Sequence, residues 1–146
     1  MLIREANLTD ASAIALLLNE MGHQSSAGDV STRLEALSNS HMDRVWVCEN
    51  NSNVIGFLSF HISPRFYAWG NLGRITAIAV QSNFRRQGYG RKLIEHAEKF
   101  AKDSDCARVE ITSYSHRIDT HQFYKSLGMT QVKSARFMKA IVGDLQ

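Results

Sequence analysis

The sequence has little cysteine, little proline and no long apolar run, and each shortage excludes a class of protein. Of its 146 residues two are cysteine and one is proline. Cys48 and Cys106 form no C-x-x-C pair, which argues against a disulfide framework or a cysteine zinc site. The longest uninterrupted apolar run, 13–18, has six residues, far below the roughly 20 that cross a bilayer. We therefore expect no membrane-spanning helix.

The sequence also lacks a strong excess of charge. Its 17 basic and 14 acidic residues leave a net charge of +3, too small to indicate a nucleic-acid binder by itself. Hydrophobic residues at 44% and charged residues at 21% exclude disordered and fibrous classes. Arg4 and Glu5 are followed by no apolar stretch, so we expect no signal peptide and a cytoplasmic location. The length predicts a single domain over residues 1–146.

The spacing of apolar residues predicts alternating strands and helices. A helix capped by Thr9 or Asp10 ends at Gly22, and the strand 75–80 is apolar on both faces, as a covered central strand would be. Together they predict an α/β (α+β) layered domain with a mixed sheet. The other predicted helices are 29–38, one from the glycines at 88 and 90 through residue 101, and 119–127, and the other strands are 2–6, 44–48, 54–62, 107–112, 129–133 and 135–141.

A basic, glycine-bearing segment lies between the strand 75–80 and the amphipathic helix that follows it. It reads Arg85-Arg86-Gln87-Gly88-Tyr89-Gly90, and Arg91 comes next. The first N–H groups of a helix have no partner within it, and glycine lets an anion approach them closely. The segment therefore predicts either a pyrophosphate site or only a tight turn with solvated arginines.

Two other nucleotide-binding motifs do not fit this segment. No G-x-x-x-x-G-K-S/T occurs in the chain, and the dinucleotide fingerprint needs a third glycine where Leu93 stands. These mismatches argue against an NTPase and against an NAD-dependent enzyme.

The glycine-bearing segment resembles a motif of a known family. Arg85-x-x-Gly88-x-Gly90, directly after the strand 75–80, resembles the acyl-CoA-binding motif Q/R-x-x-G-x-G/A of the GNAT N-acetyltransferases. A second segment, residues 120–129, looks like that family's A-x-x-F-Y-x-x-x-G-F, with Thr120 in the alanine place and Met129 in the final aromatic place. The two segments occur in the family's order, with a strand between them.

The resemblance implies a GNAT fold, a cosubstrate and a reaction. The fold is a mixed sheet of about seven strands with about four helices, in which a bulged central strand splays from its neighbour. Acetyl-CoA would pair its pantetheine arm with that strand and rest its pyrophosphate on the following turn, and a primary amine of a small molecule or a protein would attack directly in a ternary complex. The implied cofactor-binding residues are Ile78, Ala79, Val80, Arg85, Arg86, Gln87, Gly88, Tyr89, Gly90 and Arg91.

The resemblance also assigns the general acid, Tyr124, but not the base. A tyrosine near pKa 10 is about 1.5 units, roughly 2 kcal/mol, weaker as an acid than an alkyl thiol near 8.5. Tyr124 must therefore have a lowered pKa or donate its proton as the C–S bond breaks. Many relatives place a glutamate on the splayed strand, but residues 76–80 contain no acid. Glu110, His61 and a chain of water molecules remain as candidates for the base.

Other possibilities remain open. The missing strand carboxylate would also suit a non-catalytic acyl-CoA sensor or interaction module of the same fold. No histidine spacing indicates a metal site, and we expect neither a nucleic-acid nor a membrane partner. An aromatic group at Phe66, Tyr67 and Trp69 is expected either in the core or around the acceptor pocket. Family precedent allows a monomer or a homodimer, of which we favour the homodimer.

Overall fold

The structure, a computed structural model, describes residues 1–113 and 117–143. The chain divides into a larger unit, residues 1–112, and a smaller one, residues 113–146. None of the helices in these described ranges is long and apolar enough to cross a membrane.

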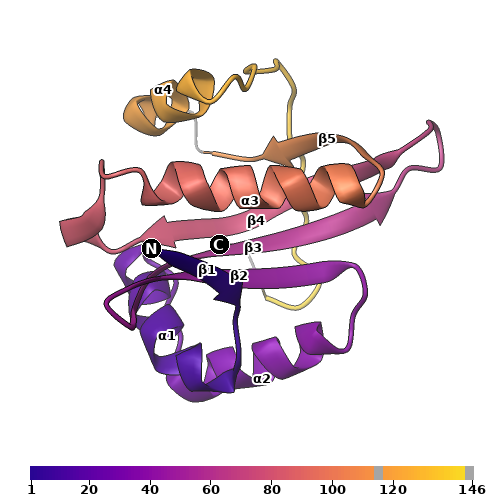
Figure 1. The fold of residues 1–146 in the computed structure, drawn as a ribbon. Helices are drawn as coiled ribbons and strands as arrows, with labels where there is room; N and C mark the ends of the chain where they lie inside the picture. The colour runs from indigo at the N-terminus through magenta and orange to yellow at the C-terminus, as the bar shows by residue number, and fades with distance from the viewer. Residues whose placement is uncertain (114–116, 144–146) are drawn as a thin grey trace. The chain divides into compact units, whose positions relative to one another are not determined.

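A five-stranded mixed sheet forms the centre of the larger unit (Figure 1). Its strands follow chain order, and each pairs antiparallel with the next except β4 and β5, which are parallel. The predicted hairpin is confirmed: Asn51 and Ser52 join its strands with φ of 50° and 65°, the left-handed values that tight hairpin turns require. The strands are β1 (Leu2–Glu5), β2 (Asp43–Asn50), β3 (Asn53–Pro64), β4 (Asn71–Val80) and β5 (Cys106–Ile111).

Helices cover both faces of this sheet. Helices α1 (Ala11–Glu20) and α2 (Ala27–Ser38) lie on one face and α3 (Tyr89–Asp103) lies on the other (Figure 1). Short 3-10 helices, η1 (Leu8–Asp10) and η2 (Ser82–Phe84), precede α1 and α3. Asp10 precedes α1 as predicted, but its side chain makes no capping hydrogen bond to that helix. The side-chain cap is instead Asn7, which accepts from the Thr9 N–H at 2.9 Å and caps η1.

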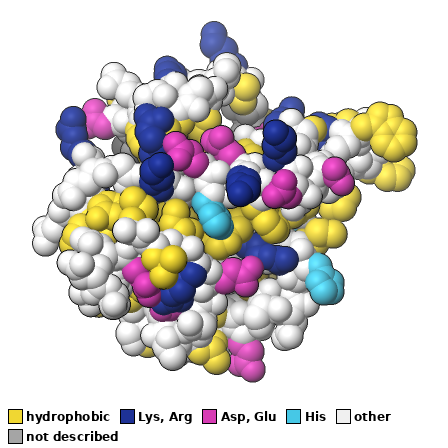
Figure 2. Space-filling model, in the orientation of Figure 1, with side chains coloured by type: hydrophobic (Ala, Val, Ile, Leu, Met, Phe, Trp, Pro, Cys, Tyr) yellow, Lys and Arg dark blue, Asp and Glu magenta, His cyan; other side chains and the backbone are white. Residues whose placement is uncertain are grey.

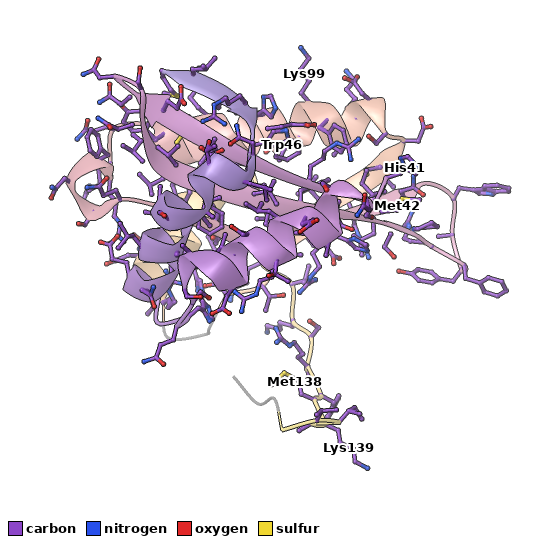
Figure 3. The ribbon with its side chains drawn as sticks, turned by 90° about the horizontal axis from the view of Figure 1, so that it is seen from below. His41, Met42, Trp46, Lys99, Met138 and Lys139 are labelled. Atoms are coloured by element: carbon purple, nitrogen blue, oxygen red, sulfur yellow. The ribbon has the colours of Figure 1, made fainter. Side chains whose placement is uncertain are left out.

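The two faces carry separate apolar layers. Under α1 and α2 lie Val47 and Phe57 of the sheet, packed with Ile14 and Leu34 of the helices. Toward α3 the sheet presents Trp46, whose ring centroid is 5.3 Å from that of Phe100 and 5.0 Å from that of His96 (Figure 3). This layering follows from period-two alternation in the strands and the apolar stripe predicted for α3.

A buried ion cluster of Arg4, Asp10 and Glu49 connects β1 to the rest of the larger unit. Arg4 contacts Asp10 at 2.8 Å and Glu49 of β2 at 2.8 Å, and Asp10 also accepts from the Asn7 N–H. Asp10 is 4% exposed. The hydrogen bonds from Arg4, helped by that from Asn7, hold the pKa of Asp10 below its ordinary value.

The smaller unit contains α4 (Ile118–Ser126), close to the predicted helix 119–127. Gly128 ends it as predicted, since its φ of 86° is left-handed. The N–H of Gly128 donates to the carbonyl of Lys125 at 3.0 Å, and that of Met129 donates to Tyr124 at 3.1 Å. These bonds satisfy carbonyls that would otherwise be unpaired at the helix end.

The two strands predicted last are not found. Residues 129–133 and 135–141 have no regular structure, so the described part of the chain holds five strands rather than about seven. Residues 130–139 are all exposed. A strand needs a paired edge to satisfy its N–H and C=O groups, and the alternation of apolar residues cannot by itself supply one. The predicted α/β class of mixed sheet and helices is confirmed.

Candidate functional site

Strand β4 loses one of its two neighbours halfway along. Its register with β5 runs from Asn71 to Ile75, which pairs with Ile111 at the end of β5. Its register with β3 continues to Val80. Among the described residues, 76–80 therefore pair with β3 on one side and with no strand on the other, which is the splay that the family resemblance implied.

The register also identifies which main-chain groups face the open side. Gln81 N–H donates to the Ile55 carbonyl at 2.7 Å, so residue 81 turns its main chain toward β3. Because this orientation alternates along an antiparallel pair, residues 77 and 79 also bond to β3. The main-chain groups of Ile78 and Val80 therefore point to the open side, while those of Ala79 do not.

A β-bulge lies where the splay begins. Ser59 pairs with Ala77 and Phe60 pairs with Ile75, so Thr76 is an extra residue on β4. Its side chain is exposed, and its hydroxyl contacts that of Ser59. The bulge places two hydroxyl groups, rather than a carboxylate, where the splay begins.

The turn after β4 presents unpaired donors. The main-chain N–H groups of residues 86–91 donate to no acceptor among the described residues, and the first bond of α3 runs from Lys92 N–H to the Gly88 carbonyl at 3.1 Å. The Arg85 side chain holds the turn to β4, since its Nε donates to the Val80 carbonyl at 3.0 Å. The rings of Phe84 and Tyr89 pack edge to face at 5.9 Å. An anion would find several donors at a helix start here.

Gly88 is the position where this turn requires glycine. Its φ is 90°, in the left-handed region, and a Cβ built there would meet no protein atom within 4 Å. Packing therefore leaves the space beside it open, and a bulky anion could reach the main chain. The sequence-predicted residues 85–91 are thus brought together, with residues 85–88 and Arg91 exposed.

Tyr124, the predicted general acid, lies in α4 of the smaller unit, with its ring centroid 5.6 Å from that of Phe123. Burial raises the pKa of Tyr124, and the charge of Arg117 opposes that effect. The structure thus gives no support to the lowered pKa that one sequence-based interpretation needed. A proton donated by this phenol would have to move as the thiolate forms.

The two predicted bases lie in one line across the sheet. Asp43, His61, Arg74 and Glu110 pair successively in register on β2, β3, β4 and β5, and we call these four residues the charge row. His61 Nδ1 is 2.9 Å from Asp43 Oδ1. Glu110 has two cationic partners, Arg108 at 3.1 Å and Arg74 at 3.8 Å.

These contacts favour different roles for the two candidates. A carboxylate at one ring nitrogen of His61 orients the imidazole and leaves its other nitrogen available to a proton, as a general base requires. Glu110 contacts Arg74 across the strand pair and Arg108 on its own strand, as a structural charge partner would. Its role as a base stays a prediction.

Sequence reasoning missed Asp43 and Arg74. Asp43 can be matched to His61 only once the register of β2 and β3 is known. For Arg74 a signal was present, because it stands one residue before the apolar run 75–80, at the polar end of a strand that begins earlier than predicted.

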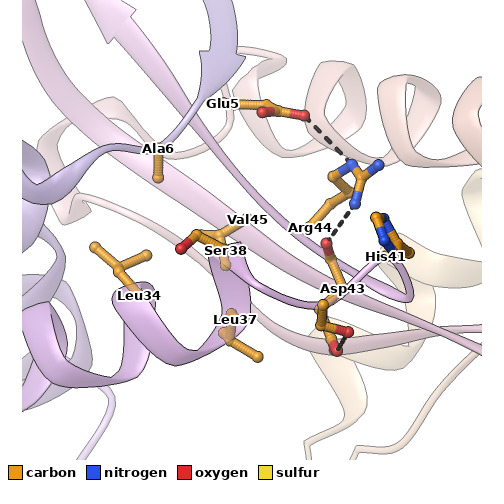
Figure 4. A pocket seen from close by; sticks show the side chains of 10 residues that line it. Glu5, Ala6, Leu34, Leu37, Ser38, His41, Asp43, Arg44 and Val45 are labelled. Carbon is orange, nitrogen blue, oxygen red and sulfur yellow. Dashed lines mark hydrogen bonds and ion pairs between the residues drawn. The ribbon is translucent and has the colours of Figure 1, made fainter.

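Two other surface features lie apart from the open edge of β4. The aromatic group is not in the core: Phe66 is 107% exposed and Trp69 is 96% exposed at the tip of the β3–β4 hairpin, where yellow side chains gather in Figure 2. A hollow of about 270 Å³ lies between the end of α2 and the start of β2 (Figure 4). In it Arg44 pairs with Glu5 at 3.3 Å, and Asp43 belongs to both the hollow and the charge row.

The family model of the acetyltransferase (GNAT) family matches residues 12–129, and the chain belongs to that family. The match includes β4, the turn at 85–90 and α4.

Individual proteins that are similar to this chain agree with its membership of the acetyltransferase (GNAT) family. An aminoalkylphosphonate N-acetyltransferase of Salmonella typhimurium is 30% identical over 91 residues, which are 62% of this chain and 58% of that protein. An uncharacterized N-acetyltransferase of Chlorobaculum tepidum is 26% identical over 144 residues, 97% of this chain and 83% of that protein. The crystal structure of a transcriptional regulator from Bacillus halodurans has the same fold, with a TM-score of 0.86, 21% identity and coverage of 95% of this chain and 99% of that one.

Proposed function

We propose that this protein transfers the acetyl group of acetyl-CoA to a primary amine. The observation that carries the proposal is the open edge of β4, which leads directly into a turn of unpaired N–H donors. The pantetheine amides would pair with the main chain of Ile78 and Val80 as an added strand. The pyrophosphate would accept from the N–H groups of residues 86–91, with Arg86 and Arg91 at the rim.

The chemistry then needs two proton movements. The neutral amine attacks the thioester carbonyl, the C–S bond breaks, and the amide forms. The leaving thiolate takes the hydroxyl proton of Tyr124, the role that the family resemblance assigns, and this transfer accompanies C–S cleavage because the pKa of the phenol is raised. The amine proton passes to a base, for which the contact with Asp43 favours His61 over Glu110.

The acceptor belongs to the class of primary amines. The named activity of the Salmonella relative makes small aminoalkyl compounds with an acidic group the first candidates. A non-catalytic acyl-CoA sensor with the same fold is the alternative, favoured by the absence of a carboxylate in residues 76–80.

An amine screen with free-thiol detection tests the proposal. The wild-type protein should release CoA in the presence of acetyl-CoA and at least one amine, and Tyr124→Phe should lower kcat at least tenfold with an acetyl-CoA Kd within twofold of wild type. Binding of acetyl-CoA without turnover of any amine would favour the sensor. A calorimetric titration without binding at about a hundred micromolar acetyl-CoA would contradict both.

A further inference from the structure

We propose that the charge row binds the acceptor and selects amines that also carry an anionic group, with Arg74 as the residue that recognises the anion. The inference rests on the proposed function, because it concerns the acceptor side of the same reaction. It adds a specificity-determining residue that the family motifs do not contain.

The charge row lies on the sheet face opposite α3, beside the splay. Phe60 contacts α3, with its ring centroid 6.0 Å from that of Phe100, so the next residue, His61, points to the other face. Arg74 is paired with His61, one residue before the point where β4 and β5 stop pairing. An amine that meets a thioester held in the splay would therefore contact the row.

The row is accessible to a small molecule. The side chains of His61, Arg74 and Glu110 are 42%, 37% and 37% exposed. A ligand could reach them without displacing the apolar layer beneath α1 and α2.

Arg74 retains donors for such a ligand. Its Nη2 donates to Thr112 Oγ1 at 2.5 Å, and its Nη1 is 3.8 Å from Glu110, beyond hydrogen-bond distance. A guanidinium has five N–H donors, and its planar fork matches carboxylate or phosphonate oxygens. Glu110 lies closer to Arg108, at 3.1 Å, which offsets its negative charge.

The order of charges along the row suits a zwitterion. Asp43 and His61 stand at one end, where an ammonium group would be attracted and could lose its proton. Arg74 stands on the next strand, and directly opposed side chains lie roughly 5 Å apart at Cβ. Arg108 balances the charge of Glu110, and Arg74 balances that of Asp43. The formal charges of the region therefore sum to zero when His61 is neutral. We therefore expect an acceptor whose amine and anionic group are separated by one to three carbon atoms.

Calorimetric titration of the CoA-bound protein tests this without requiring turnover. The probes are β-alanine, 2-aminoethylphosphonate and propylamine, which share a short chain and a primary amine but differ in the anionic group. Wild type should bind both zwitterions at least tenfold more tightly than propylamine, and a difference between the two would identify carboxylate or phosphonate as the preferred anion.

Arg74→Gln should remove the preference for zwitterions and leave the Kd for propylamine within twofold of the wild-type value. Arg74→Lys keeps the positive charge but loses the planar fork of donors, and it should retain part of the preference. Lys102→Gln, which removes one positive charge from the opposite face, is the matched control and should behave as wild type. Equal binding of all three amines, or a preference that survives in Arg74→Gln with an unchanged melting temperature, would overturn the inference. Acetylation of propylamine alongside equal binding would leave the proposed function standing, whereas Arg74-dependent binding without turnover of any amine would contradict only the proposed function.

Discussion

The two halves of β4 differ in what lies beside them. Residues 71–75 lie between β3 and β5, whereas in the part of the chain that the structure describes residues 76–80 have β3 as their one neighbouring strand. The closed half carries Arg74 and the charge row, and the open half leads to the turn at Gly88. In the proposed function, the missing strand partner leaves main-chain groups open to acetyl-CoA, and the complete set of partners aligns the side chains that would contact the acceptor.

The largest effect is expected at the turn that follows the open half. Gly88→Val should weaken acetyl-CoA binding about 30-fold, roughly 2 kcal/mol, because the valine would enter the space left for the ligand and displace charge-assisted hydrogen bonds, which are each worth about 1.5–3 kcal/mol. Calorimetry measures the change. Gly22→Val is the matched control, since Gly22 also has a φ of 90° with open surroundings and ends α1. It should lower stability and leave the affinity unchanged, and equal losses in both variants would contradict a phosphate site at Gly88.

A smaller effect, on chemistry rather than on cofactor binding, is expected in the closed half. His61→Gln should lower kcat about tenfold or more by removing the proton acceptor, while the Kd for acetyl-CoA stays within twofold. Steady-state kinetics at saturating acetyl-CoA measures this. Glu110→Gln provides the comparison, and a lower kcat in that variant alone would identify Glu110 as the base. Full activity in both variants would favour a relay through water.

Amide hydrogen exchange can compare the two halves directly. In the free protein the amides of Ile78 and Val80 should exchange fast, because they point away from β3. Those of Ala77 and Ala79 should exchange slowly, because they donate to β3. Saturating CoA should slow Ile78 and Val80 tenfold or more and change residues 71–75 little. Slowing spread evenly along the strand would indicate a general stabilisation rather than an added strand on the open side.

The smallest effect on the open half should come from the buried ion cluster. Asp10→Asn should lower the free energy of unfolding by about 3 kcal/mol at pH 7, because it breaks a buried ion pair, and should leave acetyl-CoA affinity within twofold. The pKa of Asp10 is lowered in the folded protein, so its contribution is complete above about pH 4 and is lost as the pH falls through the folded value.

Urea unfolding of wild type and variant should therefore converge at low pH. Asp29→Asn, at an exposed capping box, should cause a smaller loss. A difference between wild type and Asp10→Asn that persists unchanged at pH 2 would show that packing, not ionisation, accounts for the stabilisation.

The sequence predicts local elements better than their pairing. The apolar stripe of α3, the hairpin turn at Asn51 and the glycine after α4 follow from local patterns, and the structure contains all three. The turn at 85–90 could also be singled out, because its motif is contiguous, and its role in binding acetyl-CoA stays a prediction. The segments 129–133 and 135–141 failed as strands because a strand depends on a partner that alternation cannot indicate.

The residues of the proposed acceptor side could be predicted least well, for the same reason. The contact between His61 and Asp43 joins residues 18 positions apart. Glu110 was proposed from its residue type. Arg108, two residues earlier on the same strand, follows from the alternation of that strand, but Arg74 became evident only from the pairing of β4 with β5. Such contacts depend on register, which a single sequence specifies weakly.

The single inserted residue at Thr76 has a consequence for every position that follows it in β4. In a strand without that insertion, residues 78 and 80 would bond to β3, and the amides offered to a ligand would be those of 77 and 79 instead. The side chains would exchange faces as well, so that the bulk of Ile78 and Val80 would press into the layer beneath α1, where only Ala77 and Ala79 now fit. One extra amino acid thus sets the phase of the strand for both its packing and its recognition of a cofactor.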